Sequence, residues 1–538
     1  MRKIRIAIQA FFFLAFIIFF FLLNKYPTAY TVDSDFFLKL NPLTTLLVSI
    51  ASRQFFFDLV LISGIVFVAT IIFGRIFCGA VCPLGTLIDI VDAALPKIRS
   101  NERRPAIYLH RLKYILLIIT VTLTVFGILV PLFFDPILLI TRIFTNVVNP
   151  ALNVIISDSH HAIGSVFPDA GSYLNQTFTT KVPLFSGIGV TIFLVFLIFG
   201  GTFWDKRFWC QYICPSGAFF GLLSNWSIYK RKVDGSKCNS CARCARACPT
   251  RAIPQKDVKK TSASECILCG VCVSMKDECN RFSFGKISKN ESVPTDVKRR
   301  HVLGGLAGGL IALPAYKATA SLKRDDHGKL IRPPASLPET EFLAKCLACG
   351  SCMKACPTNA LQPCMFTDGF NKLYTPKIVP KIGGCEGQCA ICGNVCPTGA
   401  IRKVLPTDKP YIKLGTAVLD KNKCIAWEQN KECVVCDEVC PFNAIDSLEL
   451  ETTGGKFTVP VVKEDLCMGC GMCEHHCPVN DQAAIAVMRF GENRKSSGDY
   501  LTKSQREKMD IERKKTGHES LDNIPQENKS DLPVGFEE

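Results

Sequence analysis

Cysteine is the residue type that this sequence arranges for chemistry. The chain has 538 residues and 29 cysteines, and 28 of these fall into seven sets of four. Disulfide scaffolds are short secreted domains without repeated C-x-x-C spacing. Zinc sites usually combine two separated C-x-x-C pairs rather than runs of four cysteines. The repeated runs therefore favour iron–sulfur clusters.

Two runs in the middle of the chain predict a pair of [4Fe–4S] clusters that exchange one ligand. Spacing of the form C-x2-C-x2-C-x3-C-P places three thiolates on one cubane and the fourth on its neighbour. We assign one cluster to Cys238, Cys241, Cys244 and Cys279. The other takes Cys266, Cys269, Cys272 and Cys248. The gap before Cys279 is longer than usual and no proline follows that residue.

Four further runs lie toward the C-terminus, and their sixteen cysteines predict four more cubanes. Two regular runs flank two with one lengthened gap, which we interpret as pairing of the first with the fourth and of the second with the third. The outer pair would give Cys346, Cys349, Cys352 with Cys477, and Cys467, Cys470, Cys473 with Cys356. The inner pair would give Cys385, Cys389, Cys392 with Cys440, and Cys424, Cys433, Cys436 with Cys396. Short β-prone pieces between the runs favour two ferredoxin-like ββαα folds in tandem.

A different cysteine pattern occurs twice in the N-terminal half. The stretch RIFCGAVCPLG at residues 75–85 matches RFWCQYICPSG at residues 207–217. Each copy alone is half a site, but together they offer the four thiolates of a seventh cluster, from Cys78, Cys82, Cys210 and Cys214. A buried or redox-active dithiol pair is the alternative. Arg75 and Arg207, which begin the two copies, would balance the negative charge of four thiolates.

Hydrophobic segments must position these motifs. Four apolar stretches are long enough to cross a bilayer core about 30 Å thick; they are residues 6–23, 57–77, 114–134 and 182–204. Each motif copy lies at the end of the second or fourth stretch, which predicts a pseudo-twofold unit of two hairpins. Lysine and arginine are dense in residues 78–113 and sparse in residues 135–181. The positive-inside rule therefore places the N-terminus and the 78–113 loop in the cytoplasm.

The fold class predicted is a membrane α-helical protein with α+β ferredoxin-like [4Fe–4S] domains, in which a fifth short hydrophobic segment follows the four spans. The net charge is +16, and much of the excess lies beside hydrophobic segments rather than on a nucleic-acid recognition face. Lys298-Arg299-Arg300 precedes the fifth segment. That arrangement favours a twin-arginine signal for export of a folded domain, with an ordinary stop-transfer flank or a loose hydrophobic linker as the alternative.

The predicted domain order follows from these features. It comprises a four-span domain (1–230), a cytoplasmic two-cluster domain (231–290), a signal or anchor (297–320), an extended linker (321–345), a periplasmic four-cluster domain (346–490) and a disordered tail (491–538).

Isolated residues are weaker candidates. His160-His161 would ligate haem or contact quinone, but a solvated loop pair is the simpler interpretation. Asp58, Asp135 and Arg142 would handle quinone protons or, more simply, anchor the membrane interface. Cys364 is the cysteine left over, and we expect a buried thiol or a residue beside a cluster.

Residues 1–280 resemble the NapH/MauN family of membrane-bound ferredoxin-type proteins, through the four spans, the two C-x3-C-P motifs and the two-cluster domain. Residues 297–490 resemble the NapG/MauM family of exported four-cluster ferredoxins, through Arg299-Arg300, Arg332-Pro333-Pro334 and residues 375–380. The two proteins are normally separate and are fused here. The resemblance implies a quinol dehydrogenase that feeds electrons to periplasmic reductases.

The sequence thus predicts an iron–sulfur electron-transfer protein of a bacterial inner membrane. The leading hypothesis is a quinol dehydrogenase that passes electrons to a periplasmic cytochrome or reductase. Further respiratory subunits are candidate partners, and nucleic acid is not. Two alternatives stay open: flow in the reverse direction from cytoplasmic ferredoxin, and a regulatory or maturation role for another metalloenzyme. The sequence contains no flavin, nicotinamide or phosphate-loop fingerprint and no C-x-x-C-H haem attachment motif. No motif locates the quinone.

Overall fold

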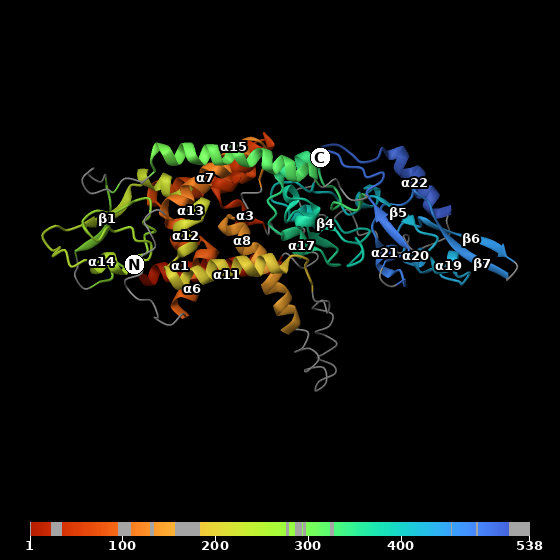
Figure 1. The fold of residues 1–538 in the computed structure, drawn as a ribbon, viewed down its shortest axis with the longest axis horizontal. Helices are drawn as coiled ribbons and strands as arrows, with labels where there is room; N and C mark the ends of the chain where they lie inside the picture. Colours follow the sequence, from red (N-terminus) through yellow and green to blue (C-terminus); the bar gives the residue numbers. More distant parts are fainter. Residues whose placement is uncertain are drawn as a thin grey trace, which may run out of the picture.

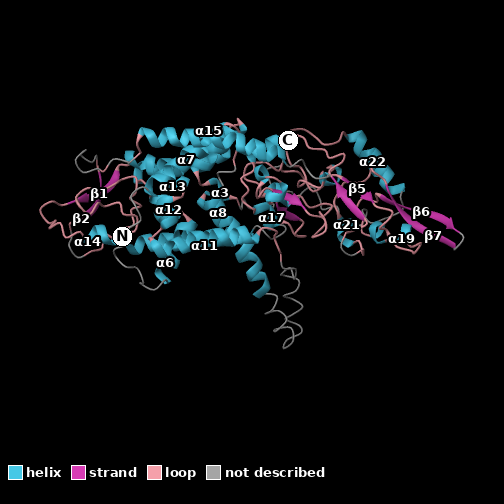
Figure 2. Ribbon diagram, in the orientation of Figure 1, coloured by secondary structure: helices cyan, strands magenta, loops and turns pink. Residues whose placement is uncertain are grey.

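The computed structural model describes residues 2–22, 35–94, 109–129, 134–155, 183–275, 279–285, 293, 297–322, 328–452, 455–479 and 482–515. Figure 1 shows an elongated molecule, in which a helical domain lies between two cysteine-rich domains. The smaller of these carries β1, β2 and α14, and the larger carries the remaining strands and α22. Helices fill the centre and strands occur toward the ends (Figure 2).

Long helices form where the sequence predicted spans. They are α1 (Arg2–Leu22), α5 (Phe57–Phe73), α7 (Leu109–Val125) and α11 (Ile188–Trp204). By length and composition, two helices of the described residues are able to cross a membrane, Arg2–Phe21 and Pro136–Ile155. Pro42–Ser52, Phe57–Phe73 and Ile188–Trp204 are apolar but shorter. Crossing by four spans therefore stays a prediction.

Two half-length helices enter the middle of the helical domain, and the sequence analysis missed both. They are α4 (Pro42–Ser52), which follows α3 (Phe36–Lys39), and α8 (Pro136–Ile143), which continues through η3 (Phe144–Val148). Each begins at a proline, preceded by Asn41 or Asp135 whose side chain accepts hydrogen bonds from the first backbone amides. A capping side chain followed by proline fixes a helix start. Residues 136–155, predicted to lie in an outer loop, thus form a largely buried helix.

The internal repeat predicted from the sequence is also a structural repeat. In the first copy, η1 (Phe77–Val81) leads into α6 (Pro83–Ala94). In the second, α12 (Phe208–Tyr212) leads into α13 (Pro215–Leu223) and η4 (Ser224–Trp226). The first half of the domain supplies α1, α4, α5 and one motif, and the second supplies α7, α8, α11 and the other. The helical domain is therefore built from two similar halves.

A further long helix, α15 (Arg299–Leu322), lies along α7 (Figure 1). Glycines allow the close approach, because a Cβ on Gly305 would lie 2.9 Å from Ile118 and one on Gly309 would lie 2.8 Å from Thr122. At these contacts the residue numbers increase in the same direction along both helices, so the two helices run parallel. Small residues four apart are a common packing surface between membrane helices. The segment predicted to be a signal or anchor is thus a continuous helix packed on the helical domain.

Short antiparallel strand pairs and one-turn helices build the cysteine-rich domains. In the smaller one, β1 (Tyr229–Val233) pairs with β2 (Asn280–Phe284), and α14 spans Arg243–Ala247. In the larger one, the pairs are β3 (Leu361–Pro363) with β4 (Pro376–Ile378), β5 (Thr416–Leu419) with β8 (Ile485–Met488), and β6 (Ile445–Thr452) with β7 (Gly455–Val462). Its helices are α16 (Glu339–Lys345), α17 (Ser351–Ala355), α18 (Ile391–Asn394), α19 (Ile425–Glu428), α20 (Val435–Glu438), α21 (Met472–His476) and α22 (Lys503–Lys515). Single 3₁₀ turns are η7 (Phe366–Asp368), η8 (Phe370–Lys372) and η9 (Lys409–Tyr411).

The predicted linker 321–345 was wrong for residues 328–345, which belong to the larger domain. Arg332 is 1% exposed, and its Nη1 donates to Thr375 Oγ1 at 2.9 Å. Its Nη2 pairs with Glu339 at 2.6 Å. Burial alone would raise the pKa of Glu339, but the charges and hydrogen bonds of Arg332 and Arg494 lower it to about 2. A proline-rich stretch is therefore held in place by one buried arginine.

The predicted disorder of residues 491–538 was wrong for residues 491–515, which end in α22. Arg506 and Arg513 lie over the ring of Tyr411, and Asp510 accepts a hydrogen bond from the Tyr411 hydroxyl at 2.8 Å. Arginines stack well on aromatic rings, so a charged segment docks without an apolar face. Residues 516–538 lie outside the described residues.

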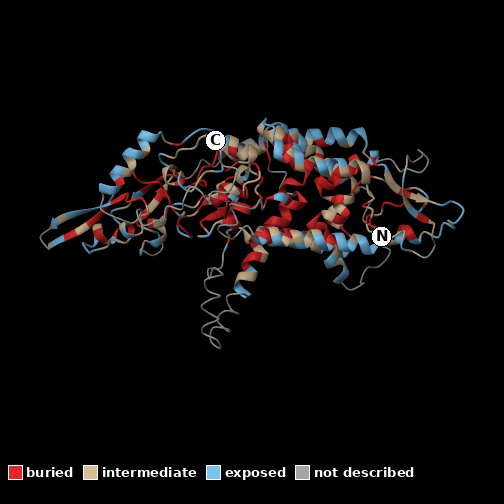
Figure 3. Cartoon of the chain, turned by 180° about the vertical axis from the view of Figure 1, so that it is seen from behind, coloured by how far each residue is buried: buried red, intermediate tan, exposed pale blue. Residues whose placement is uncertain are grey.

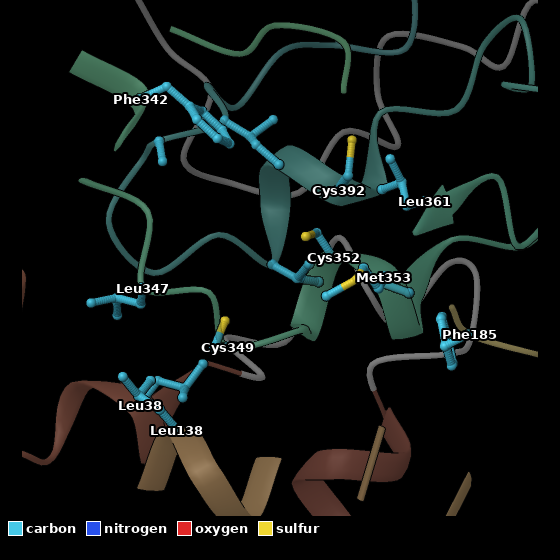
Figure 4. Packing of buried hydrophobic residues seen from close by; sticks show 14 of the residues in the cluster. Leu38, Leu138, Phe185, Phe342, Leu347, Cys349, Cys352, Met353, Leu361 and Cys392 are labelled. Carbon is cyan, nitrogen blue, oxygen red and sulfur yellow. The ribbon is translucent and has the colours of Figure 1, made fainter. Parts of the chain in front are cut away.

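One continuous hydrophobic core joins the helical domain to the larger cysteine-rich domain (Figure 3). Figure 4 shows the junction, where Leu38 and Leu138 lie below Leu347 and Cys349. These side chains come from α3, α8 and the first C-terminal cysteine run. The helical domain therefore packs directly against the loop that carries cluster ligands.

Candidate iron–sulfur sites

In the smaller cysteine-rich domain, the four cysteines predicted to form the second set lie together. A small hollow is lined by Cys248, Cys266, Cys269 and Cys272. In the first set, Arg231 links two of the ligand segments. Its Nη2 lies 3.6 Å from Cys244 Sγ, and its Nε donates to Asn280, the neighbour of Cys279, at 2.8 Å.

The larger domain pairs its runs differently from the prediction. Cys396 lies close enough to Cys346, Cys349 and Cys352 for charge repulsion to raise their pKa values, and Cys356 does the same to Cys385, Cys389 and Cys392. One small hollow is lined by Cys467, Cys470, Cys473 and Cys440, and another by Cys424, Cys433, Cys436 and Cys477. The first run therefore exchanges a ligand with the second, and the third with the fourth. The nested assignment of Cys477, Cys356, Cys440 and Cys396 was wrong.

Helix packing explains this correction. The short helix before the fourth cysteine of each run packs against its counterpart in the next run, α17 against α18 and α20 against α21. Each fourth cysteine thus lies beside the first three of its partner run. The lengthened gaps follow Cys385 in the second run and Cys424 in the third run. Each exchanging pair therefore contains one regular run and one run with a lengthened gap, and the two irregular runs do not pair with each other.

The cysteine sets fit clusters better than single ions. Among the described residues, no three His, Cys, Asp or Glu side chains are grouped closely enough to share one metal ion. The four irons of a cubane stand apart, so their thiolates are spread more widely than around one zinc. Burial raises the pKa of Cys470 and of Cys436 to about 12. Such thiols become thiolates when a positively charged metal centre binds them.

The two C-x3-C-P copies meet to form the cysteine tetrad, by which we mean Cys78, Cys82, Cys210 and Cys214. Cys82 and Cys214 are buried, and each interacts electrostatically with both Cys78 and Cys210. The Gly217 backbone amide donates to Cys214 Sγ at 3.2 Å. Four thiols from two repeats thus surround one place at the helix ends.

The arginine that begins each repeat contacts the other repeat. Arg207 Nη1 donates to the Cys78 carbonyl at 2.7 Å, and its side chain pairs with Asp89 at 2.7 Å. Arg75 lies against Gly217, where a Cβ would approach Arg75 Nη2 to 3.1 Å. Both arginines are 1% exposed. The repeats are therefore locked reciprocally, and two buried cations face the tetrad.

The smaller cysteine-rich domain contacts the tetrad directly. A Cβ on Gly79, between Cys78 and Cys82, would overlap the Ile267 carbonyl oxygen, which lies between two ligands of the second set. Arg75 Nη1 donates to the Ser264 carbonyl at 2.7 Å. Buried Lys113 from α7 binds both carboxylate oxygens of Glu265 at 2.6 Å. Ligand loops of two neighbouring cluster sites thus touch through backbone atoms.

The half-helix α8 connects the tetrad to the larger domain. At its start, Asp135 accepts hydrogen bonds from Ser216, two residues after Cys214, at 2.7 Å, and from Asn41. At its end, Arg142 Nε donates to the Ala348 carbonyl, between Cys346 and Cys349, at 2.7 Å. A helix of eight residues is about 12 Å long. The separation of the two sites is therefore set by one short, buried helix.

Asp135 and Arg142 are 0% and 1% exposed, so the simpler expectation that they anchor a membrane interface was wrong. Asp58 is exposed in the first turn of α5. Cys364 is a buried thiol whose Sγ lies 3.6 Å from Arg332 Nη1. His160-His161 lies outside the described residues. Sequence reasoning missed Asn41, although Asn41-Pro42 carries the same capping signal as Asp135-Pro136.

Within the larger domain, the two pairs of runs meet at one hydrogen bond. The Cys385 amide donates to the Cys470 carbonyl at 2.7 Å. Buried Lys409 interacts electrostatically with both of these cysteines. The cluster sites of the second and fourth runs are thus neighbours, and a cation lies beside both.

Family profiles agree with this distribution of sites. A profile described as a 4Fe–4S binding domain matches residues 55–102, 185–234 and 387–405, so one profile recognises both halves of the tetrad. A 4Fe–4S dicluster domain matches residues 423–480, and another 4Fe–4S binding domain matches residues 231–253 and 342–362.

Several known proteins that match the chain are ferredoxin-type proteins. The methylamine utilization ferredoxin-type protein MauM of Methylorubrum extorquens is 36% identical over 208 residues, which are 37% of this chain and 89% of that protein. The chain belongs to the MauM/NapG family. Ferredoxin-type protein NapG of Escherichia coli is 37% identical over 193 residues, which are 34% of this chain and 80% of that protein. MauM of Paracoccus denitrificans is 36% identical over 187 residues, which are 34% of the chain and 79% of that protein. As a MauM/NapG relative, the chain is an iron–sulfur protein of electron transfer.

Proposed function

We propose that this chain is a membrane-bound quinol dehydrogenase that fuses a NapH/MauN-like helical part to its MauM/NapG-like part and delivers electrons to a periplasmic redox protein. The observation that carries the proposal is the position of the tetrad between the two cysteine-rich domains. The smaller domain contacts it through Ile267, and the larger domain is connected to it through α8. Clusters bound at these sites would supply one-electron carriers.

The protein's own residues hold neighbouring sites close together. Backbone contacts join the second set to the tetrad, α8 joins the tetrad to the first C-terminal set, and the Cys385–Cys470 hydrogen bond joins the next two. Buried cations, namely Arg75, Arg207, Arg142 and Lys409, lie beside the ligands and offset the negative charge of thiolates. These contacts together describe a path through the helical domain.

The surface of the helical domain suits a bilayer. Large apolar side chains are exposed along its outer helices, including Leu61 and Ile65 on α5 and Phe193 and Phe196 on α11. Soluble proteins rarely expose contiguous apolar surface on this scale. Because α15 runs parallel to α7, both would cross in the same direction, and residues 328–515 would emerge opposite the smaller cysteine-rich domain. The positive-inside rule would make that side periplasmic.

The test is reduction of the clusters by quinol. The purified full chain with its clusters is mixed anaerobically with a menaquinol analogue, and cluster reduction is followed by electron paramagnetic resonance. The proposal predicts signals that depend on quinol and vanish when the quinone form is added instead. Absence of a quinol-dependent signal in a protein that dithionite still reduces would contradict it.

A second candidate function is electron entry from a soluble cytoplasmic ferredoxin. The observation that favours it is the far end of the smaller domain, where the ligand Cys241 is exposed. Lys237, Arg243 and Arg246 are exposed around it. A basic face beside an accessible cluster site suits an acidic redox partner. Two results would favour this candidate. The rate of reduction by ferredoxin would fall steeply as salt concentration rises, and the reduction potentials of the clusters would be too low for quinol to reduce them.

A further inference from the structure

Asp135 is a fully buried carboxyl group at the start of α8, and hydrogen-bond donors surround it. Its Oδ1 accepts hydrogen bonds from two backbone amides of the helix, at 3.0 and 3.2 Å. Its Oδ2 accepts from Asn41, Thr44 and Ser216. Each oxygen thus already receives at least two donors, so neither is left to carry a proton.

The orientation of Asn41 fixes the direction of these hydrogen bonds. Asn41 Oδ1 accepts from the Leu43 amide at 3.1 Å, so its Nδ2 faces Asp135 and Ser216. Ser216 Oγ receives an N–H of Asn41 at 3.0 Å and therefore turns its own hydrogen toward Asp135, 2.7 Å away. A carboxylic acid must donate once, whereas a carboxylate only accepts. Since every neighbour donates, the structure holds Asp135 as a carboxylate.

The negative charge of Asp135 lies beside the tetrad without a cation of its own. Within the part of the chain that the structure describes, no lysine or arginine forms an ion pair with it. Ser216 joins it to the segment of Cys214, and the charges of Asp135 and Cys214 are close enough to repel. Arg75 and Arg207, by contrast, each pair with a carboxylate. A buried charge is costly, and within membrane domains it usually has a function.

The repeat shows that the carboxylate is not needed to start the helix. Asn41-Pro42 begins α4 in the first half of the domain, and Asp135-Pro136 begins α8 in the second. Both side chains accept a hydrogen bond from the backbone amide two residues further on. Asparagine and aspartate cap helices about equally well. The charge that only the second half carries therefore indicates a different role.

The opposite charge lies at the other end of α8. Arg142 is 1% exposed, and its Nε donates to the Ala348 carbonyl at 2.7 Å. Its charge is close enough to Cys346 and Cys349 to attract their thiolates. Figure 4 shows Leu138, on the same helix, below Cys349. These cysteines belong to the first C-terminal set, which comprises Cys346, Cys349, Cys352 and Cys396.

Fixed charges change the reduction potential of a redox centre beside them. An anion disfavours an added electron and lowers the potential, whereas a cation favours the electron and raises the potential. Because the protein interior screens charges weakly, one unit charge near a cluster changes its reduction equilibrium on the order of tenfold, which is 59 mV for one electron. The two ends of α8 therefore act in opposite directions on the sites beside them.

We propose that Asp135 and Arg142 set the direction of electron transfer along α8, from the tetrad to the first C-terminal set. This inference rests on the proposed function, which requires clusters at both sites, and adds the direction. Asp135 makes the tetrad the poorer electron acceptor, and Arg142 makes the first C-terminal set the better one. One electron leaves the tetrad and enters the first C-terminal set, so one site is oxidised and the other reduced, without transfer of a proton. Neither side chain is a cluster ligand; both act through their charge.

The test measures the midpoint potentials of the two sites in the full chain with its clusters. Anaerobic redox titrations are followed by electron paramagnetic resonance. The signal of the tetrad is identified by its loss in Cys214→Ser, and that of the first C-terminal set by its loss in Cys349→Ser. Iron analysis reports whether each variant keeps its clusters. In the wild type, the tetrad should have the lower midpoint.

Three substitutions test the charges, and a fourth is the matched control. Asp135→Asn removes the negative charge and keeps a capping side chain. Arg142→Met removes the positive charge, and Arg142→Lys retains it. Asp58→Asn makes the same change as Asp135→Asn at an exposed carboxylate, in the first turn of α5 and so at the end of that helix remote from the tetrad.

We expect shifts of opposite sign at the two sites. Asp135→Asn should raise the tetrad midpoint by about 59 mV, a tenfold change in its reduction equilibrium. Arg142→Met should lower the midpoint of the first C-terminal set by a similar amount, Arg142→Lys should restore most of it, and Asp58→Asn should change neither site. Loss of packing alone gives no reason for opposite shifts, so this pattern distinguishes charge from structure.

The outcomes separate the direction from the proposed function. The inference is overturned if the two midpoints do not shift in Asp135→Asn and Arg142→Met, if the wild-type tetrad has the higher midpoint, or if no wild-type signal depends on Cys214. Each of these results is compatible with reduction of the other clusters by quinol. If quinol does not reduce the wild type, the proposed function fails, while the midpoint shifts still test the inference. If Asp135→Asn loses iron, the wild-type order and the two Arg142 variants decide the matter.

Discussion

The ferredoxin-type sets and the cysteine tetrad are two opposite ways to build a site for four thiolates. In each ferredoxin-type set, three ligands lie on one segment of the chain and the fourth comes from the partner run. In the tetrad, two ligands come from each half of the helical domain, and the halves hold one another through Arg75 and Arg207. A local loop is nearly sufficient for the first kind of site. The second kind requires that whole helices pack.

The largest expected effect separates the two kinds of site by composition. Cys214→Ser removes one tetrad ligand and leaves the ferredoxin-type ligands intact. Since each cubane holds four irons, seven sites hold about 28 and the variant should hold about 24. Iron analysis of the purified chain measures this. Cys364→Ser is the control and should keep the wild-type iron content, whereas equal iron in Cys214→Ser would show that the tetrad holds no cluster.

Breaking the reciprocal lock should destabilise the helical domain. Arg207→Met leaves Asp89 without its main partner, although Asp89 is 28% exposed and keeps Arg5. We therefore expect a loss of roughly 2–3 kcal/mol, below that for a fully buried pair. Arg207→Lys keeps the charge and should lose less. The midpoint of thermal unfolding in detergent measures both, and a midpoint unchanged in Arg207→Met would refute the lock.

A smaller effect is expected where the second ferredoxin-type set touches the tetrad. Gly79→Ala adds a methyl group that overlaps the Ile267 carbonyl, which is backbone and moves only with its cluster loop. Overpacking of this kind costs about 1–3 kcal/mol. In Gly64→Ala on α5, by contrast, the added methyl group meets open space. Limited proteolysis of the smaller domain should be faster in Gly79→Ala than in Gly64→Ala. Equal rates of digestion in the two variants would show that the contact between Gly79 and Ile267 does not hold the smaller domain in place.

The smallest expected effect lies in the larger domain and depends on pH. The depressed pKa of Glu339 means that its ion pair with Arg332 stabilises the fold fully above the unfolded pKa of about 4.3, and less as pH falls toward 2. Glu339→Gln should therefore lower the unfolding midpoint at pH 7, and the difference from wild type should narrow below about pH 4.3. If the difference in unfolding midpoint between Glu339→Gln and the wild type were the same at every pH between 7 and 3.5, the stabilising role of the ion pair would be contradicted.

The same contrast explains what the sequence could and could not predict. Spacing within a run is local, so candidate ferredoxin-type ligands could be predicted from residues a few positions apart. Which run supplies a fourth ligand depends on how α17 and α18, or α20 and α21, pack, and the lengthened gaps misled that assignment. The repeat of Arg75–Gly85 at Arg207–Gly217 was visible because both halves use the same chemistry.

Burial inside the helical domain was harder to predict. Asp135 and Arg142 were interpreted as interface residues because charges at the ends of apolar stretches usually contact water and headgroups. The structure instead uses them at the two ends of α8, one bonded beside the tetrad and the other to a cluster loop. Both helices were missed, although capping residues followed by proline marked their starts; only α4 is too short to be a span.

The central claim is that the tetrad connects the two cysteine-rich domains into one path across the membrane. The most direct measurement uses the full chain in sealed liposomes, with ferricyanide inside and titanium citrate, an impermeant reductant, outside. The account predicts that ferricyanide is reduced many times faster with the wild-type chain than with Cys214→Ser, while the ferredoxin-type clusters of both are reduced equally by dithionite after the liposomes are dissolved. Equal rates across the membrane in the two proteins would contradict it.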